Sequence, residues 1–90
     1  MLEAKIEKAV CDYAKSKGFL VYKFTSPNRR SVPDRMFIRA GLVFFIEFKR
    51  AGAKPTAMQD REAQKIAAQD INVYFVDDIE MGKSIIDTLC

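Results

Sequence analysis

Asp34, Glu47 and Lys49 have residue types and a spacing that would let them bind a metal ion and act on a ligand beside it. Residues 35–39 (RMFIR) and 42–48 (LVFFIEF) are rich in apolar, aromatic and β-branched side chains, which predicts two strands. The two residues between these segments form a candidate hairpin loop.

If the loop has only two residues, Asp34 lies directly opposite Glu47 in the hairpin. Cβ atoms of directly opposed residues are roughly 4.5–5.5 Å apart, and like charges at that separation destabilise a sheet. A divalent cation would offset the repulsion, because hard cations take carboxylate oxygens as ligands. Lys49 would point to the same face as Glu47. A bulge at Gly41 would shift the register by one residue, so that the acids would be near neighbours but not opposed.

Composition limits the class of protein and the metal. Ninety residues predict one domain spanning 1–90, and 49% hydrophobic residues exclude a disordered chain. The sequence lacks an apolar run of roughly 20 residues and a signal-peptide core, so we expect a soluble, cytoplasmic protein. With no histidine and only Cys11 and Cys90, a zinc site is excluded, and oxygen ligands favour magnesium or manganese. We expect Cys11 on the polar side of the first helix.

The first predicted helix, over residues 2–17, carries two more acids near its apolar stripe. At 100° per residue, Glu3 falls close to the stripe and Glu7 at its margin. A carboxylate near a buried stripe needs a partner. The alternative for both acids is that they complement the positive end of the helix. The expected stripe consists of Leu2, Ile6, Ala9, Val10, Tyr13 and Ala14.

The remaining elements complete a single α/β domain. We expect a strand over 19–24, a helix over 57–69, a strand over 73–76 and a last helix over 79–89. Both faces of segment 42–48 are apolar as far as its acid, which predicts a central strand covered on both sides. The order is helix, three strands, helix, strand, helix.

Gln59 has two possible roles at the start of the second expected helix. Thr56 is a candidate N-cap, and Thr56-x-x-Gln59 fits a capping box. On the helical wheel, however, Gln59 shares a stripe with Ala63 and Ile66, which would turn it inward toward the acids. The sequence leaves both roles open.

The net charge of +3 and the pI near 9.0 permit nucleic-acid binding without proving it. Arg29 and Arg30 stand in a polar, turn-rich loop over residues 25–32 with no acid near them in sequence. Arginines in such a loop suit bidentate contact with phosphate. The alternative is an ordinary solvated loop.

The combination of these motifs resembles the VRR-NUC family, the virus-type replication and repair nucleases of the PD-(D/E)XK superfamily, in its stand-alone phage form. The resemblance covers roughly residues 2–76. Ser31 is a departure, since the family usually has glycine there. The matching residues, in the family's order and spacing, are Glu3, Arg30-Ser31-Val32-Pro33-Asp34-Arg35, Phe45-Ile46-Glu47-Phe48-Lys49 and Gln59.

The resemblance implies a restriction-endonuclease-like core, with a mixed central sheet flanked by helices, that hydrolyses phosphodiester bonds. Asp34, Glu47 and the backbone carbonyl of Phe48 would then bind Mg²⁺ or Mn²⁺, and Lys49 would orient or activate the attacking water. Two further residues would support this catalytic site: Glu3, which would assist the metal directly or through water, and Gln59.

The resemblance also implies branched DNA, above all the Holliday junction, as substrate, a homodimer as the assembly, and a phage-infected or bacterial cell as the setting. One alternative is a non-catalytic nucleic-acid-binding module. Another is a general duplex-DNA nuclease with the same site. The residues predicted to contact DNA are Arg29, Arg30, Arg35, Arg50 and Lys54.

Overall fold

The computed structural model describes residues 1–25 and 32–90 of the chain. The order of its elements is the one expected from the sequence. These elements are α1 (Glu3–Ser16), β1 (Leu20–Lys23), β2 (Arg35–Arg39), β3 (Leu42–Phe48), α2 (Ala57–Ala67), β4 (Asn72–Val76) and α3 (Ile79–Leu89).

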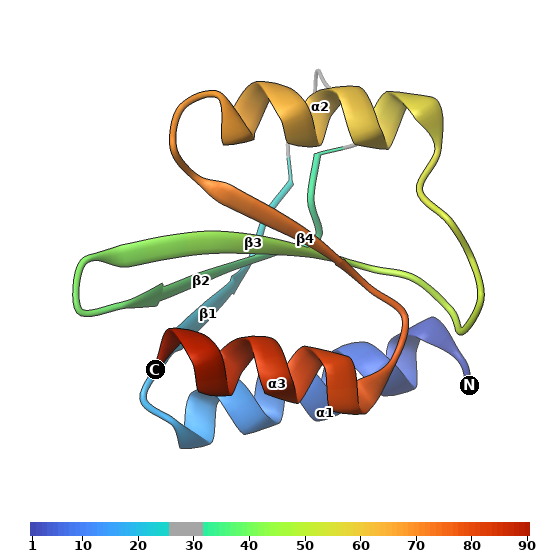
Figure 1. Cartoon of the computed structure of the whole chain (residues 1–90). Coiled ribbons are helices and arrows are strands. Elements are labelled where there is room, and N and C mark those ends of the chain that lie inside the picture. Colours follow the sequence, from blue (N-terminus) through green and yellow to red (C-terminus); the bar gives the residue numbers. More distant parts are fainter. Residues whose placement is uncertain (26–31) are drawn as a thin grey trace.

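The four strands form one mixed sheet in the order β1-β2-β3-β4. The first three strands are antiparallel neighbours, whereas β4 pairs with β3 in parallel after the α2 crossover. Figure 1 shows α1 and α3 on one face of the sheet and α2 on the other. The central position of β3 and its cover on both faces confirm the prediction made from its two apolar faces.

The β2–β3 hairpin has the register predicted for a two-residue loop. Arg39 pairs with Leu42, and the ladder continues to Arg35 opposite Ile46 without a bulge. Ala40 has φ of 49° and the glycine after it has φ of 85°. Positive φ at both central positions is typical of a type I′ turn, whose twist matches that of paired strands. The alternative register with a bulge at Gly41 is therefore wrong.

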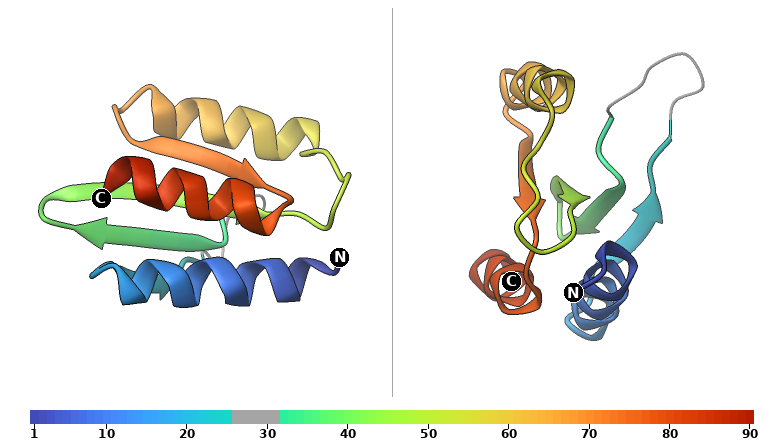
Figure 2. Two further views of the ribbon diagram at one scale, coloured as in Figure 1. Left: turned by 60° about the horizontal axis from the view of Figure 1, so that its bottom comes forward. Right: turned by 90° about the vertical axis from the view of Figure 1, so that its right-hand side faces the viewer.

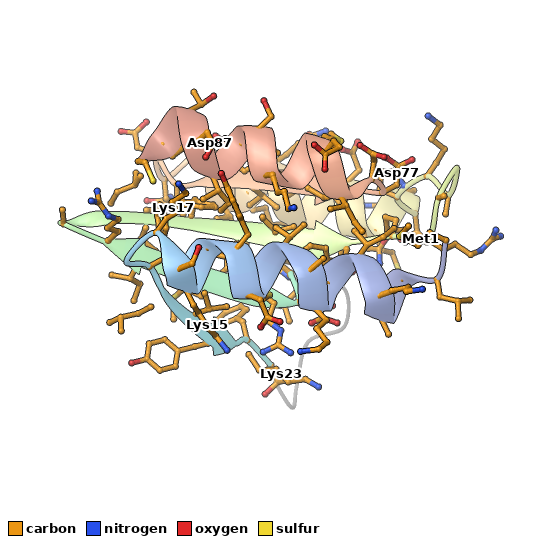
Figure 3. The ribbon with its side chains drawn as sticks, turned by 90° about the horizontal axis from the view of Figure 1, so that it is seen from below. Met1, Lys15, Lys17, Lys23, Asp77 and Asp87 are labelled. Carbon is orange, nitrogen blue, oxygen red and sulfur yellow. The ribbon has the colours of Figure 1, made fainter. Side chains whose placement is uncertain are left out.

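The larger core lies between the sheet and the pair α1 and α3, which run side by side in Figure 3. Phe37 and Phe44 stack with ring centroids 5.0 Å apart, on neighbouring strands. This stack lies in the same buried cluster as Ile6, Val10 and Ile86 from the helices. Dispersion and burial of these large side chains hold the two layers together.

Two predictions about α1 are wrong. Cys11 is 6% exposed and belongs to the core, because α1 packs against both the sheet and α3 and so buries a wider stripe. Leu2 is 75% exposed, because it is the N-cap residue and not part of the helix face. Glu3, expected close to the stripe, is exposed, and Glu7 is half-buried at the margin. The predicted arginine loop, with Arg29 and Arg30, lies outside the described residues.

Gly82 allows α3 to approach α1 closely. A Cβ atom at this position would lie 2.5 Å from Cγ2 of Val10 and 3.2 Å from Cγ1 of Val76. Contacts that short require the packed neighbours to move. The sequence shows only that this glycine weakens the helix, whereas the structure gives its packing reason.

We therefore expect Gly82→Ala to destabilise the protein by roughly 1–2 kcal/mol, because overpacking outweighs the about 1 kcal/mol gain in helix propensity. Urea unfolding measures this change. Ser84→Ala, at an exposed position of the same helix, is the control and should stay within about 0.5 kcal/mol of wild type. Equal stabilities of Gly82→Ala and wild type would contradict the close packing of α1 and α3.

Candidate active site

Asp34 and Glu47 are brought together by the hairpin. Asp34 immediately precedes β2, and the β2–β3 register continued by one residue places it across from Glu47. The backbone N–H of Phe24 donates to the Asp34 carbonyl at 2.8 Å, which extends the β1–β2 pairing up to the acid. The N–H of Phe48 donates to Oδ2 of Asp34 at 2.9 Å and fixes its carboxylate against β3.

The environment of the two carboxylates penalises their negative charge. Glu47 is 7% exposed and is the one buried charged residue among those the structure describes. Burial, and secondly the nearby Asp34 carboxylate, raise its pKa to about 8, although Lys49 opposes the shift. Burial also raises the pKa of Asp34, against the lowering effect of the Phe48 N–H. Two acids held in this way are suited to a cation that would neutralise them.

Gln59 links the cap of α2 to the acids. Its Nε2 donates to Oε2 of Glu47 at 3.3 Å, and its Oε1 accepts from Nζ of Lys49 at 3.0 Å. The same Oε1 accepts from the Thr56 backbone N–H at 3.0 Å, and the Gln59 N–H donates to Oγ1 of Thr56 at 3.1 Å. The two roles that the sequence left open are therefore present together. The capping box orients a side chain that in turn orients Lys49.

Glu3 lies near the acids but not among them. It is exposed at the start of α1, and its charge contributes to the raised pKa of Glu47. Within residues 1–25 and 32–90, no group of three or more His, Cys, Asp or Glu side chains is close enough to hold an ion together. An ion at this site would thus have two carboxylates, and a role for Glu3 through water stays a prediction.

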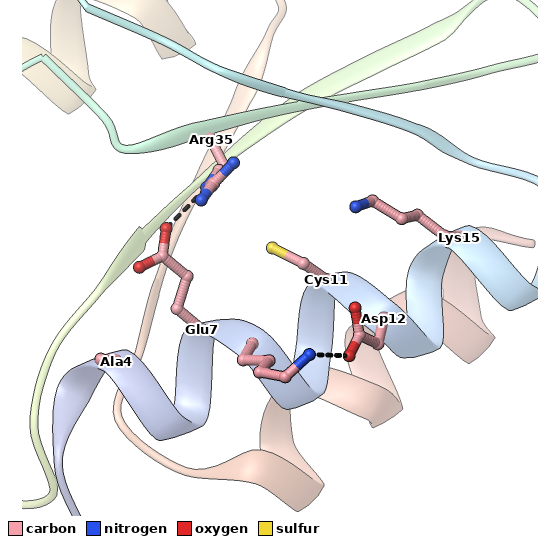
Figure 4. A pocket seen from close by; sticks show the side chains of 7 residues that line it. Ala4, Glu7, Cys11, Asp12, Lys15 and Arg35 are labelled. Atoms are coloured by element: carbon pink, nitrogen blue, oxygen red, sulfur yellow. Dashed lines mark hydrogen bonds and ion pairs between the residues drawn. The ribbon is translucent and has the colours of Figure 1, made fainter.

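Glu7 and Arg35 form an ion pair on the opposite face of the sheet. Nε of Arg35 lies 2.6 Å from Oε2 of Glu7, in a pocket that α1 lines with Cys11 and Lys15 (Figure 4). Neighbouring strand residues point to opposite faces, which separates this arginine from Asp34. DNA contact by Arg35 stays a prediction, and a phosphate would have to share its guanidinium with Glu7.

The segment after β3 carries further basic residues. Arg50 and Lys54 are exposed there, as expected of residues that contact DNA. Asp77 accepts a hydrogen bond from the Gly52 N–H at 3.1 Å and so ties this segment to the end of β4. Asp77 was not among the site residues that the sequence singled out. Its actual contact depends on the parallel pairing of β3 and β4, for which the sequence has no local signal.

The donor atoms at the acids fit a hard divalent cation. Carboxylate oxygens of Asp34 and Glu47, with the Phe48 carbonyl beside them in β3, provide oxygen ligands only, the set that Mg²⁺ and Mn²⁺ prefer. Glu47 is buried and Asp34 is half-buried, and Lys49, which is bonded to Gln59, only partly offsets the cost of their charge. The fit rests on these oxygen ligands and on two acids whose negative charge is disfavoured until a cation binds.

Comparisons with known proteins agree with this geometry. No protein-family model matches the chain. It is 38% identical over 81 residues to "Putative nuclease p44" of Acyrthosiphon pisum secondary endosymbiont phage 1, a match that covers 89% of this chain and 87% of the relative. A solved structure described as a VRR_NUC domain has a TM-score of 0.86 and 25% sequence identity, with 94% of both chains covered.

The mixed sheet, its flanking helices and the acids at the end of the central hairpin define a nuclease domain of the PD-(D/E)XK type. Within that class, the chain belongs to the VRR-NUC family. No helix in the described part of the chain has the length and apolar content needed to cross a membrane.

The raised pKa of Glu47 predicts a pH-dependent stability. Its pKa is about 8 in the folded protein against an ordinary value of 4.5, so the folded state holds this proton more tightly. The resulting stabilisation is fully present below about pH 4.5 and is lost as the pH rises to about 8. In EDTA, the melting temperature of wild type should fall over this range more than that of Glu47→Gln.

Glu80→Gln, which removes an exposed carboxylate on α3, is the control and should follow wild type. The Glu47→Gln variant should be at least as stable as wild type at pH 8.5. A clearly lower melting temperature for Glu47→Gln at that pH would contradict a buried Glu47 whose negative charge destabilises the fold.

Proposed function

We propose that this protein is a Mg²⁺- or Mn²⁺-dependent endonuclease that hydrolyses phosphodiester bonds in branched DNA, with the four-way junction as its preferred substrate. The observation that supports this most is the position of Asp34 across the hairpin from the buried Glu47, with Lys49 held beside them by Gln59. A cation between the acids and an ammonium beside them would place positive charge on both sides of a phosphate. The name of the phage relative supports the nuclease activity.

Each residue of the site has a specific role in this proposal. Asp34, Glu47 and the Phe48 carbonyl would hold the metal ion, which when bound lowers the pKa of its water and stabilises charge on the phosphate. Lys49, held by Gln59 at 3.0 Å, donates a hydrogen bond to the attacking water or to a phosphate oxygen and offsets the developing negative charge. Because Glu47 must lose its proton to bind the ion, metal affinity should rise with pH.

Recognition of DNA shape fits this chain better than recognition of base sequence. Base-edge readout needs an element placed in a groove, and the described residues show no element beyond the nuclease fold. Contacts to the DNA backbone position a protein without reading sequence. We assign such contacts to Arg29, Arg30, Arg35, Arg50 and Lys54. A homodimer would supply two sites related by two-fold symmetry, which matches the two equivalent strands of a junction.

Cleavage of a labelled four-way junction beside linear duplex of the same sequence tests the proposal. We expect cutting of the junction with Mg²⁺ or Mn²⁺, no cutting in EDTA, and loss of cutting in Glu47→Ala and Lys49→Ala with the fold retained. Tight junction binding without cutting under any metal would instead support a non-catalytic binding module. Equal cutting of junction and duplex would support a general duplex nuclease with the same active site.

Two variants separate the contacts of Gln59 with Glu47 and Lys49 from its part in helix capping. Gln59→Ala should reduce cleavage by about 10- to 100-fold, because residues that support metal ligands typically have effects of that size. Thr56→Ala removes the cap hydroxyl but keeps the contacts of Gln59 with Glu47 and Lys49. It should cost about 0.5–2 kcal/mol of stability with a much smaller effect on cleavage. Equal losses of activity in the two variants would reduce Gln59 to a capping residue.

A further inference from the structure

A strip of aromatic side chains leads away from the acids along one face of the sheet. Phe24 is bonded through its backbone N–H to the Asp34 carbonyl at 2.8 Å. Its ring centroid lies 4.9 Å from that of Phe45, which shares the Glu47 face of β3 two residues away. The strip therefore begins directly beside the two carboxylates.

Tyr22 continues this strip on the open side of the sheet. It pairs with Met36 in the β1–β2 ladder and, two residues before Phe24, points to the same face. Tyr22 is 50% exposed, and Leu20 next along that face is 54% exposed. The helix on this face, α2, packs on β4 at the other side of the sheet and leaves β1 uncovered (Figure 2).

We propose that Tyr22 and Phe24 form a stacking surface for an unstacked nucleobase of the DNA strand whose phosphate lies at the acids. This inference rests on the proposed nuclease function and deepens it. Two residues along a strand span about 7 Å and neighbouring strands lie about 5 Å apart, so the ring of Tyr22 is within about one or two nucleotides of the acids. Every base has a π-face, so such stacking tolerates any sequence.

The strip also offers a physical source of selectivity for branched DNA. A base inside a duplex must be unstacked at a cost of a few kcal/mol before it can reach a protein surface. At a branch point the continuous stack of the duplex is interrupted, so a base reaches Tyr22 at a lower cost. Stacking on the strip would then stabilise the complex with branched DNA more than the complex with duplex.

Continuity with the acids favours a nucleobase over a second copy of the chain as the occupant. The aromatic strip ends at Asp34 and Glu47, where the substrate backbone has to lie. A second copy seated on the strip would crowd the approach of DNA to those acids. The exposed Tyr22 hydroxyl also stays in water when a base stacks on the ring, since only the ring face is covered.

Fluorescence anisotropy in Mg²⁺ measures the binding. Every protein in this test carries Glu47→Gln, so that cleavage does not interfere. The probes are a four-way junction, a flap with one unpaired base, and a linear duplex. Adding Tyr22→Leu, which keeps an apolar side chain but removes the π-face, should weaken binding of both branched probes by about tenfold and of duplex by much less. Adding Tyr22→Phe instead should restore the affinity.

Leu20→Ala is the matched control on the same face and should change affinity by less than about twofold. The salt dependence of binding should be the same with and without Tyr22→Leu, because no phosphate contact is lost. Unchanged junction binding by Tyr22→Leu would overturn the proposal. So would equal losses in Leu20→Ala and Tyr22→Leu accompanied by dissociation in sedimentation, which would identify the face as an interface between copies.

The outcome also separates this inference from the proposed function. Ring-dependent binding of branched probes by a wild-type protein that cuts no DNA would retain the stacking surface and reject the nuclease. Metal-dependent junction cutting that is unaffected by Tyr22→Leu would retain the nuclease and reject the stacking surface. Failure of every protein to bind any probe would overturn both.

Discussion

Asp34 and Glu47 face one another across the end of the central hairpin, where negative charge on Asp34 disfavours negative charge on Glu47, and most of the structure can be understood from that constraint. The type I′ turn and the apolar pairs between β2 and β3 fix the register, so neither strand can slip to separate the acids. A slip by one residue would turn the buried side chains of both strands toward the wrong face. Core packing therefore supplies the energy that holds two acids in an environment that disfavours their charge.

The side chains around the pair reduce this cost without removing it. The Phe48 N–H stabilises the Asp34 carboxylate, and Gln59 donates to Glu47. Gln59 also accepts from Lys49, so the ammonium is held beside the acids by an amide. In the proposed mechanism, this arrangement leaves both carboxyl groups to a cation and the lysine to a phosphate. A direct ion pair between Lys49 and Glu47 would neutralise the site and weaken both functions.

Structural features that depend on residues close together in the chain were predictable from the sequence. The hairpin register follows from a two-residue loop between alternating apolar segments, and the capping box follows from Thr56-x-x-Gln59. The error at Leu2 is a misplaced helix start, and the others concern tertiary contacts. Cys11 is buried because α3 packs on α1, although neither helix indicates this in its own sequence. The link between Asp77 and Gly52 likewise requires a parallel pairing between segments that are far apart in the chain.

The two faces of the sheet differ in what they contribute. One face stabilises the fold, and the other leaves Asp34 and Glu47 accessible. One face carries the large core under α1 and α3, where the close contact at Gly82 leaves no room for a methyl group. Among the described elements, α2 is the helix that covers the other face, on its β4 side, and Ala63 is the one residue of that helix that is buried. A second helix over β1 and β2 would bury Leu20 and Tyr22 and add stability. It would also cover the side from which, in our proposal, a nucleic-acid strand reaches Asp34 and Glu47, so the exposed strip fits a site that has to stay accessible.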